Sequence, residues 1–310
     1  MKHLEDTPWW ICDEGDYNFC AYVDTDSNYF NAEPLLKHLY PDFEEKDDTE
    51  KDNLLEQIAL KYQDIITNDY DRLARDCFNV QEHRLEMKTE AVIRSAYFRA
   101  TRRYAQWITK QEGIAKESLD IKGLEFKKAN FPPIFGEFFN DILQQILKGG
   151  EQKHIDKLIM DFRDKIMSKS TDIALLGNPT SVKTLNEYVA RKPRAGEVLT
   201  ELKKGAPANV KAAVKYNDLL RFWQLDKQHS PIVQGDKIKW IYLIDNPYKI
   251  EVIGFLSFDV PDRMRKFLND YADRRKSFET ILQSKLENFY TDLGWTLNLN
   301  PNINKFFQFQ

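Results

Sequence analysis

Apolar residues recur at three- and four-residue steps between residues 53 and 79, and this spacing predicts an amphipathic helix of about seven turns. Strand-like composition precedes it at 17–22 and 28–30, and alternation of apolar and polar residues over 82–111 predicts further strands. Glu112-Gly113 is a turn signal, and another strand is expected over 118–126. We therefore expect an antiparallel sheet backed by the long helix. A polar, acidic loop is expected over 42–52.

Pro132-Pro133 marks a boundary, because a residue that precedes proline avoids the helical region and proline suits the first turn of a helix. Beyond it the pattern predicts mainly helices, with two strands among them. The predicted fold class is thus α+β, with a first domain over 1–131, a mainly helical second domain over 132–300 and a tail over 301–310. The helices are expected at 134–147, 152–167, 210–223 and 262–290, and the strands at 237–244 and 250–258.

The composition is that of a globular protein, since 42 % of the 310 residues are apolar and 13 % are aromatic. Cys12, Cys20 and Cys77 have no CxxC spacing and are expected to be free thiols in a reducing compartment. The five histidines are too scattered for a zinc site. No apolar run is long enough to span a membrane, and the N-terminus lacks the apolar core of a signal peptide. We therefore expect a soluble cytoplasmic protein.

Charge is divided unevenly along the chain. Residues 1–90 contain 9 Lys or Arg and 23 Asp or Glu, a net charge of −14, whereas residues 91–310 contain 36 and 26, a net charge of +10. An acidic part that binds metal, followed by a basic part that contacts phosphates, would have this distribution. The alternative is that an acidic surface loop biases the first count, but it does not explain the positive remainder.

Two carboxylates lie one residue apart in the string Tyr22-Val23-Asp24-Thr25-Asp26-Ser27, within the expected hairpin. Strand alternation would send Asp24 and Asp26 to one side of the sheet. Carboxylates this close repel unless cations lie between them, and Mg²⁺ prefers such oxygen ligands. Two ions roughly 3.5–4 Å apart would clamp the attacking and leaving oxygens of a phosphoryl transfer. The alternative is an ordinary solvated turn, in which Asp is common.

The string resembles motif C of family B DNA polymerases, and the motifs that follow resemble those of tailed-phage replicative enzymes in the same order. The stretch 83–91 resembles their palm strand with an acidic residue, here Glu90, and 101–105 resembles the Lys-Lys-Arg-Tyr motif that grips the primer–template duplex. The segment 120–125 resembles the end of the palm. The resemblance is firm over 16–150 and extends to 207–217 in the thumb.

The resemblance implies a partial palm, over 1–131, followed by a thumb, over 132–300. Asp24 and Asp26 would hold two Mg²⁺ ions, with Glu90 as an assisting carboxylate; the alternative for Glu90 is a salt bridge to a base such as Arg102. Arg102 and Arg103 would contact phosphates or the minor groove, unless they lie on a solvated strand face. The other residues expected to contact DNA are Tyr104, Lys122, Lys127, Lys128, Lys211, Lys215 and Tyr216.

The C-terminal tail carries Phe306, Phe307 and Phe309. Exposed phenylalanines are unfavourable unless a pocket receives them, and in the family a short aromatic tail docks on the sliding clamp. The resemblance therefore implies a clamp-binding tail. The alternative is a tail that folds back on its own thumb.

The sequence departs from the family in what precedes motif C, where an exonuclease domain, the motif A aspartate and the fingers would stand. We expect one chain of a split polymerase, inactive until it joins an N-terminal chain in the cytoplasm of an infected bacterial host, where it extends primer–template DNA with dNTPs. Without that chain, the apolar side of the 53–79 helix should be uncovered. The alternative function is a non-catalytic remnant that binds DNA and the clamp. Smaller departures are Val23, Thr101, Asn209 and Lys211, which replace family residues.

Overall fold

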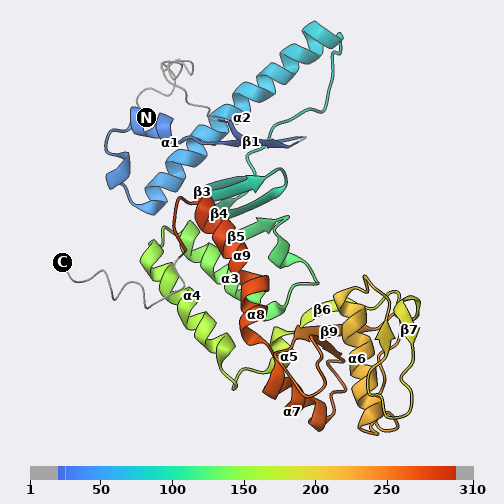
Figure 1. Cartoon of the computed structure of the whole chain (residues 1–310). Helices are drawn as coiled ribbons and strands as arrows, with labels where there is room; N and C mark the ends of the chain where they lie inside the picture. The colour runs from blue at the N-terminus through green and yellow to red at the C-terminus, as the bar shows by residue number, and fades with distance from the viewer. Residues whose placement is uncertain (1–19, 25, 298–310) are drawn as a thin grey trace, which may run out of the picture. The chain divides into compact units, whose positions relative to one another are not determined.

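The computed structural model describes residues 20–24 and 26–297, and the chain divides between Leu124 and Glu125 into two compact units, whose elements are labelled in Figure 1. Both units mix helices with small antiparallel sheets, so the α+β class is confirmed. The boundary that we predicted from the proline pair, between residues 131 and 132, lies seven residues further along the chain than the observed one. Within the described residues, no helix is both long and apolar enough to cross a membrane.

The first unit contains a two-stranded hairpin, a three-stranded sheet and one long helix. The hairpin pairs β1 with β2, and the sheet has the order β3-β4-β5, with each strand antiparallel to its neighbour. The elements are β1 (Cys20–Asp24), β2 (Ser27–Phe30), α1 (Glu33–Leu39), η2 (Phe43–Glu45), α2 (Asp48–Phe78), β3 (Ala91–Ala100), β4 (Arg103–Gln111) and β5 (Ile114–Lys122).

The long helix predicted at 53–79 is confirmed, although α2 begins five residues earlier. The Asp47 side chain accepts a hydrogen bond from the N–H of Glu50 at 2.8 Å, and acidic residues in the first turn favour the helix dipole. Part of the acidic segment that we expected to be a loop is therefore the N-cap and first turn. The helix ends at Asn79, whose φ of 52° is left-handed.

The α2 helix contacts the sheet through charged residues. Arg94 of β3 donates to Asp48 and Asp52 at 2.6 and 2.7 Å, and Lys110 of β4 donates to Asn53 and Glu56, both at 2.6 Å. The apolar residues of the N-terminal half instead pack with α1 and η2. This small core contains Leu36, Phe43 and Ile58, with Leu54, Leu55 and Tyr62 against it.

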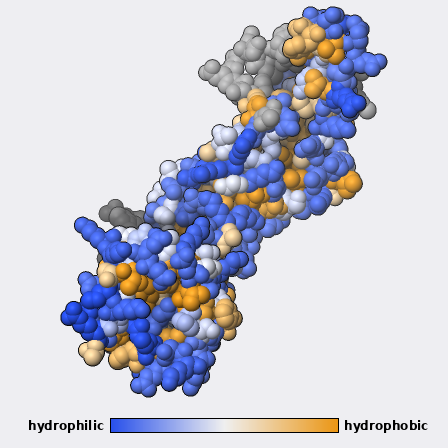
Figure 2. Space-filling model, turned by 90° about the vertical axis from the view of Figure 1, so that its right-hand side faces the viewer, coloured by the Kyte–Doolittle hydropathy of each residue, from blue (hydrophilic) through white to orange (hydrophobic). Residues whose placement is uncertain are grey.

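The far end of α2 and the segment after it leave apolar side chains in solvent. The top of the molecule in Figure 2, where this end of the helix lies, carries an orange apolar surface. The exposed residues of this region include Leu73 (43 %), Phe78 (68 %), Val80 (40 %) and Leu85 (56 %). A protein surface of this kind is typical of a contact site.

Two strand predictions need correction. Residues 82–90 form no strand, and β3 begins only at Ala91; β5 runs over Ile114–Lys122, whereas we expected 118–126. The first residues of β5 are exposed on both faces, so they lack the alternation that marks a half-buried strand. The turn predicted at Glu112-Gly113 is confirmed, since both residues have positive φ.

The second unit packs helices around a three-stranded antiparallel sheet of order β10-β9-β6, and α6 lies directly on β10. A Cβ atom on Gly254 would lie 3.2 Å from the carbonyl carbon of Ala212, so the glycine permits this close packing. The elements are η3 (Glu125–Lys127), α3 (Pro133–Leu147), α4 (Gln152–Met167), α5 (Ile173–Leu176), β6 (Asn178–Ser181), η4 (Asn186–Tyr188), β7 (Val189–Arg191), β8 (Glu201–Leu202), α6 (Ala208–Phe222), β9 (Lys237–Tyr242), β10 (Val252–Phe255), α7 (Asp262–Tyr271), α8 (Arg274–Phe278), η5 (Glu279–Gln283, a π-helix) and α9 (Ser284–Asp292).

The helix predicted at 152–167 is confirmed with the same ends, and the helices predicted at 134–147 and 210–223 and the two strands are confirmed with small shifts in their ends. The single helix predicted at 262–290 is wrong. It breaks after Tyr271, where Ala272 is extended, and it restarts after Asp273, whose side chain accepts from the N–H of Lys276 at 2.8 Å. Ser, Asp and Asn favour such caps because they satisfy the free N–H groups of a first turn.

Candidate functional site

The β1–β2 hairpin carries the two candidate metal-binding carboxylates at its tip. Asp24 ends β1 and pairs with Ser27, and the N–H of Asp26 donates to the carbonyl oxygen of Asp24 at 2.6 Å. Asp26 therefore lies in the turn and is exposed. Strand alternation, on which we based the prediction that both carboxylates share one side of the sheet, does not extend to Asp26, because the strand ends at Asp24.

Asp24 forms a two-point ion pair with Arg102 of the turn between β3 and β4. The guanidinium places Nε 3.0 Å from Oδ2 and Nη2 3.2 Å from Oδ1. The Asp24 carboxylate raises the pKa of Arg102 above its usual value. The backbone N–H of Arg102 also donates to the Tyr22 hydroxyl at 2.9 Å. The structure thus brings together two segments that are 78 residues apart, the string around Asp24 and the Thr-Arg-Arg-Tyr segment.

Four aromatic rings hold the hairpin against the sheet. Tyr22 and Tyr29 of the hairpin contact Phe98 and Tyr104 of β3 and β4, with ring centroids 5.4–5.9 Å apart. The Tyr29 and Tyr104 hydroxyls lie 3.0 Å apart, and burial, together with this hydrogen bond, raises the pKa of Tyr29. Tyr104 was expected to contact DNA, but its side chain is only 5 % exposed and packs inside this cluster.

Glu90 is not brought to the hairpin tip. It precedes β3, and its carbonyl accepts from the N–H of Glu112, which places it at the β4–β5 turn. Arg102 lies at the other end of the ten-residue β3, roughly 30 Å away at the usual rise of a strand. The salt bridge between Glu90 and Arg102 that we considered is therefore excluded.

Asp24 and Asp26 supply carboxylate oxygens of the kind that Mg²⁺ prefers. Among residues 20–24 and 26–297, no three His, Cys, Asp or Glu residues gather as a metal site. The hairpin tip alone therefore offers two carboxylates, of which Asp24 already contacts a guanidinium.

The other residues expected to contact DNA fall into two groups. Arg103, Lys122, Lys127 and Lys128 are exposed, and Lys211 is partly exposed. Lys215 and Tyr216 are not available at the surface. Lys215 donates to the Thr200 carbonyl at 2.7 Å with its side chain 17 % exposed, and Tyr216 is fully buried. Phe306, Phe307 and Phe309 lie outside the described residues.

Two features of this region were missed from the sequence. Gly123 packs against the Arg102 turn, and its position directly after a strand was a signal for a close approach of two backbones. The ion pairs that bind α2 to the sheet were signalled by Asp48, Asp52 and Glu56, because residues four apart share one face of a helix.

Comparison of the chain with models of known protein families and with curated proteins finds no match.

Proposed function

We propose that this chain is the C-terminal part of a DNA-directed DNA polymerase of family B. Its first unit would form part of the palm and supply Asp24 and Asp26 to two Mg²⁺ ions, and its second unit would form the thumb that grips primer–template DNA. The observation that carries the proposal is the ion pair between Asp24 and Arg102. It joins the segment that resembles motif C to the segment that resembles the duplex-gripping motif.

The chemistry of this pair suits nucleotidyl transfer. Carboxylates at a hairpin tip can hold Mg²⁺, which stabilises charge on the attacking and leaving oxygens. A guanidinium beside them can bind a phosphate of the primer with two hydrogen bonds. When DNA and metal bind, Arg102 would exchange Asp24 for a phosphate, and Asp24 would exchange Arg102 for the metal.

We further propose that the exonuclease, the motif A aspartate and the fingers are supplied by a partner. The exposed apolar end of α2, around Phe78, is a surface that such a partner could cover. The C-terminal phenylalanines would bind a sliding clamp.

A second candidate function is a non-catalytic protein that binds DNA and the clamp. The position of Glu90 favours it, since this carboxylate lies at the end of β3 opposite the Asp24–Arg102 pair. In this alternative function, the hairpin tip takes no part in catalysis.

Primer extension with Mg²⁺ separates the two candidates. The chain would be assayed alone, with a separately expressed N-terminal part of a tailed-phage family B polymerase, and with that part while carrying Asp26→Ala. Synthesis only in the mixture, abolished by Asp26→Ala and retained by the matched surface variant Asp245→Ala, is the expected result. DNA binding by the mixture without synthesis would favour the non-catalytic candidate.

A further inference from the structure

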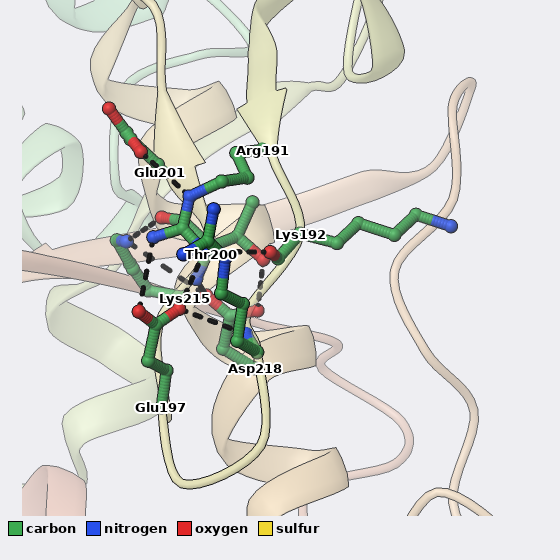
Figure 3. A network of polar contacts seen from close by, with 8 residues as sticks. Arg191, Lys192, Glu197, Thr200, Glu201, Lys215 and Asp218 are labelled. Carbon is green, nitrogen blue, oxygen red and sulfur yellow. Dashed lines mark hydrogen bonds and ion pairs between the residues drawn. The ribbon is translucent and has the colours of Figure 1, made fainter.

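A short two-stranded ribbon in the second unit is fixed to α6 by a buried polar network (Figure 3). Asp218 of α6 is 1 % exposed and accepts hydrogen bonds from the N–H and the hydroxyl of Thr200, both at 2.6 Å. Lys215 donates to the carbonyl oxygen of the same threonine. We call residues 189–206, which include β7, β8 and the loop between them, the basic ribbon.

The acidic residues of the basic ribbon are neutralised within it. Its only carboxylates are Glu197 and Glu201, and Arg191 pairs with both, at 2.7 and 3.1 Å. Four exposed cations remain, and none of them forms an ion pair with a carboxylate in the part of the chain that the structure describes. They are Lys192, Arg194, Lys203 and Lys204. In Figure 3 the Lys192 side chain extends away from the network.

We propose that the basic ribbon binds the phosphodiester backbone of duplex DNA through these four cations. The inference rests on the proposed function and assigns the phosphate contacts of the second unit. Of the two residues that the sequence suggested for this role, Lys215 is turned inward by the network that holds the ribbon, and Tyr216 is buried in the core of the unit. The four cations of the basic ribbon instead have exposed side chains.

The spacing of the cations suits a regular polyanion. The N–H of Lys203 donates to the carbonyl oxygen of Tyr188, so Lys203 and Lys204 lie near the start of β7. Lys192 and Arg194 follow the end of β7. Tyr188 and Lys192 lie four positions apart, with the three residues of β7 between them; at the usual rise of a strand this is roughly 13 Å, close to the axial rise of about four base pairs.

A membrane surface fits the ribbon less well. Peripheral segments that bind lipid combine cations with apolar residues that enter the bilayer. Between residues 189 and 206 the large apolar side chains are Val189, Val198, Leu199 and Leu202, and all of them are partly buried. The ribbon therefore presents charge without an apolar anchor.

The test measures binding of the full-length chain to a fluorescent duplex by anisotropy over a series of KCl concentrations. The variant replaces Lys192, Arg194, Lys203 and Lys204 with Gln. The matched control also replaces four cations with Gln, so it has the same net charge as the ribbon variant. Its positions are the exposed residues Lys153, Lys157, Lys165 and Lys169. We expect the ribbon variant to lose affinity by roughly tenfold or more and to lower the magnitude of the slope of log K against log[KCl] by about 3.6, which is about 0.9 for each of the four cations. The control should stay within about twofold of the wild type.

Arginine replacements at Lys192, Lys203 and Lys204 should keep the affinity, because phosphate contacts need charge more than shape. The proposal fails if wild-type chain does not bind the duplex, if the ribbon and control variants lose affinity equally, or if phosphatidylserine vesicles compete as well as unlabelled DNA at equal charge. The proposed polymerase function is judged separately, by primer extension, since the anisotropy measurement contains neither dNTPs nor a partner and reports only on DNA binding.

Discussion

The α-carbon of Gly123 lies against the backbone carbonyl of Arg102, so close that a Cβ atom on Gly123 would be 1.9 Å from that oxygen. The residue that follows β5 therefore packs directly against the β3–β4 turn. Gly123 also has a φ of +66°, which other residues adopt only with strain. The turn that presents the Arg102 guanidinium to Asp24 therefore requires that Gly123, 21 residues further along the chain, has no side chain.

Gly123→Ala should destabilise the first unit by about 3 kcal/mol, because left-handed strain of about 1–2 kcal/mol is added to a clash with rigid backbone. Gly113→Ala is the control. Gly113 has a similar φ of +78°, but the nearest atom to its added Cβ would be the flexible Glu56 carboxylate at 3.5 Å, so only about 1 kcal/mol should be lost. Urea unfolding of both variants gives the comparison. Equal losses would show that the Arg102 turn does not need the glycine.

Arg102→Gln should increase the affinity of the chain for Mn²⁺ severalfold, because the guanidinium and a metal ion compete for the Asp24 carboxylate. Titration followed by Mn²⁺ electron paramagnetic resonance measures the free ion directly. Arg103→Gln removes the adjacent exposed charge and should change the affinity less. Asp24→Asn combined with Arg102→Gln should abolish the gain. If the gain survives this double change, Arg102 does not act through Asp24.

Arg94→Met should cost about 3 kcal/mol of unfolding free energy, because it leaves Asp52, only 6 % exposed, as an unpaired charge against the sheet. Asp52→Leu added to Arg94→Met should recover most of the loss. Among the described residues, Asp52 Oδ1 and Arg94 Nε have no hydrogen-bond partner, so the native pair is already incompletely satisfied. The exposed partner gives the control: Asp48→Asn should cost less than about 1 kcal/mol. Failure of the double variant to recover would argue that this pair fixes α2 on the sheet.

The second unit should lose stability between pH 10 and 12. Burial raises the pKa of Tyr216 to about 12, whereas an unfolded tyrosine titrates near 10. The folded state therefore keeps a proton that the unfolded state releases, and its stability is complete below pH 10 and falls as pH rises through this window. The expected share of Tyr216 is about 2 kcal/mol.

Tyr216→Phe provides the control for this pH effect. The hydroxyl donates only a long hydrogen bond, 3.3 Å, to the Asp259 carbonyl, so the variant should be nearly as stable as the wild type at pH 7. Urea unfolding monitored by tryptophan fluorescence at pH 8 and above should show a shallower decline for the variant. Parallel declines would mean that other groups carry the alkaline loss.

Local patterns in the sequence were sufficient for the long helices α2, α3, α4 and α6 and for the strands β9 and β10. The spacing of Leu54, Ile58 and Tyr62 predicted the long helix, and the Glu112-Gly113 pair predicted the turn, because both depend on neighbours within a few residues. The candidate carboxylates and the exposed bases Arg102 and Arg103 could also be selected from the sequence. Local patterns were less reliable at Asp26, where the end of a strand replaced alternation with a turn.

Contacts between distant segments were decided only by the tertiary structure. Packing against the β3–β4 turn placed Arg102 on Asp24, and the length of β3 kept Glu90 away from both. Tyr104, Lys215 and Tyr216 carry groups that suit DNA, yet neighbouring elements cover them. The periodicity of apolar residues predicts which residues share a face of one element. Which segment packs against that face depends on contacts between segments that lie tens of residues apart in the sequence. The sequence therefore determined the long periodic elements and the candidate chemical groups, and the fold decided which of these groups contact one another and which face solvent.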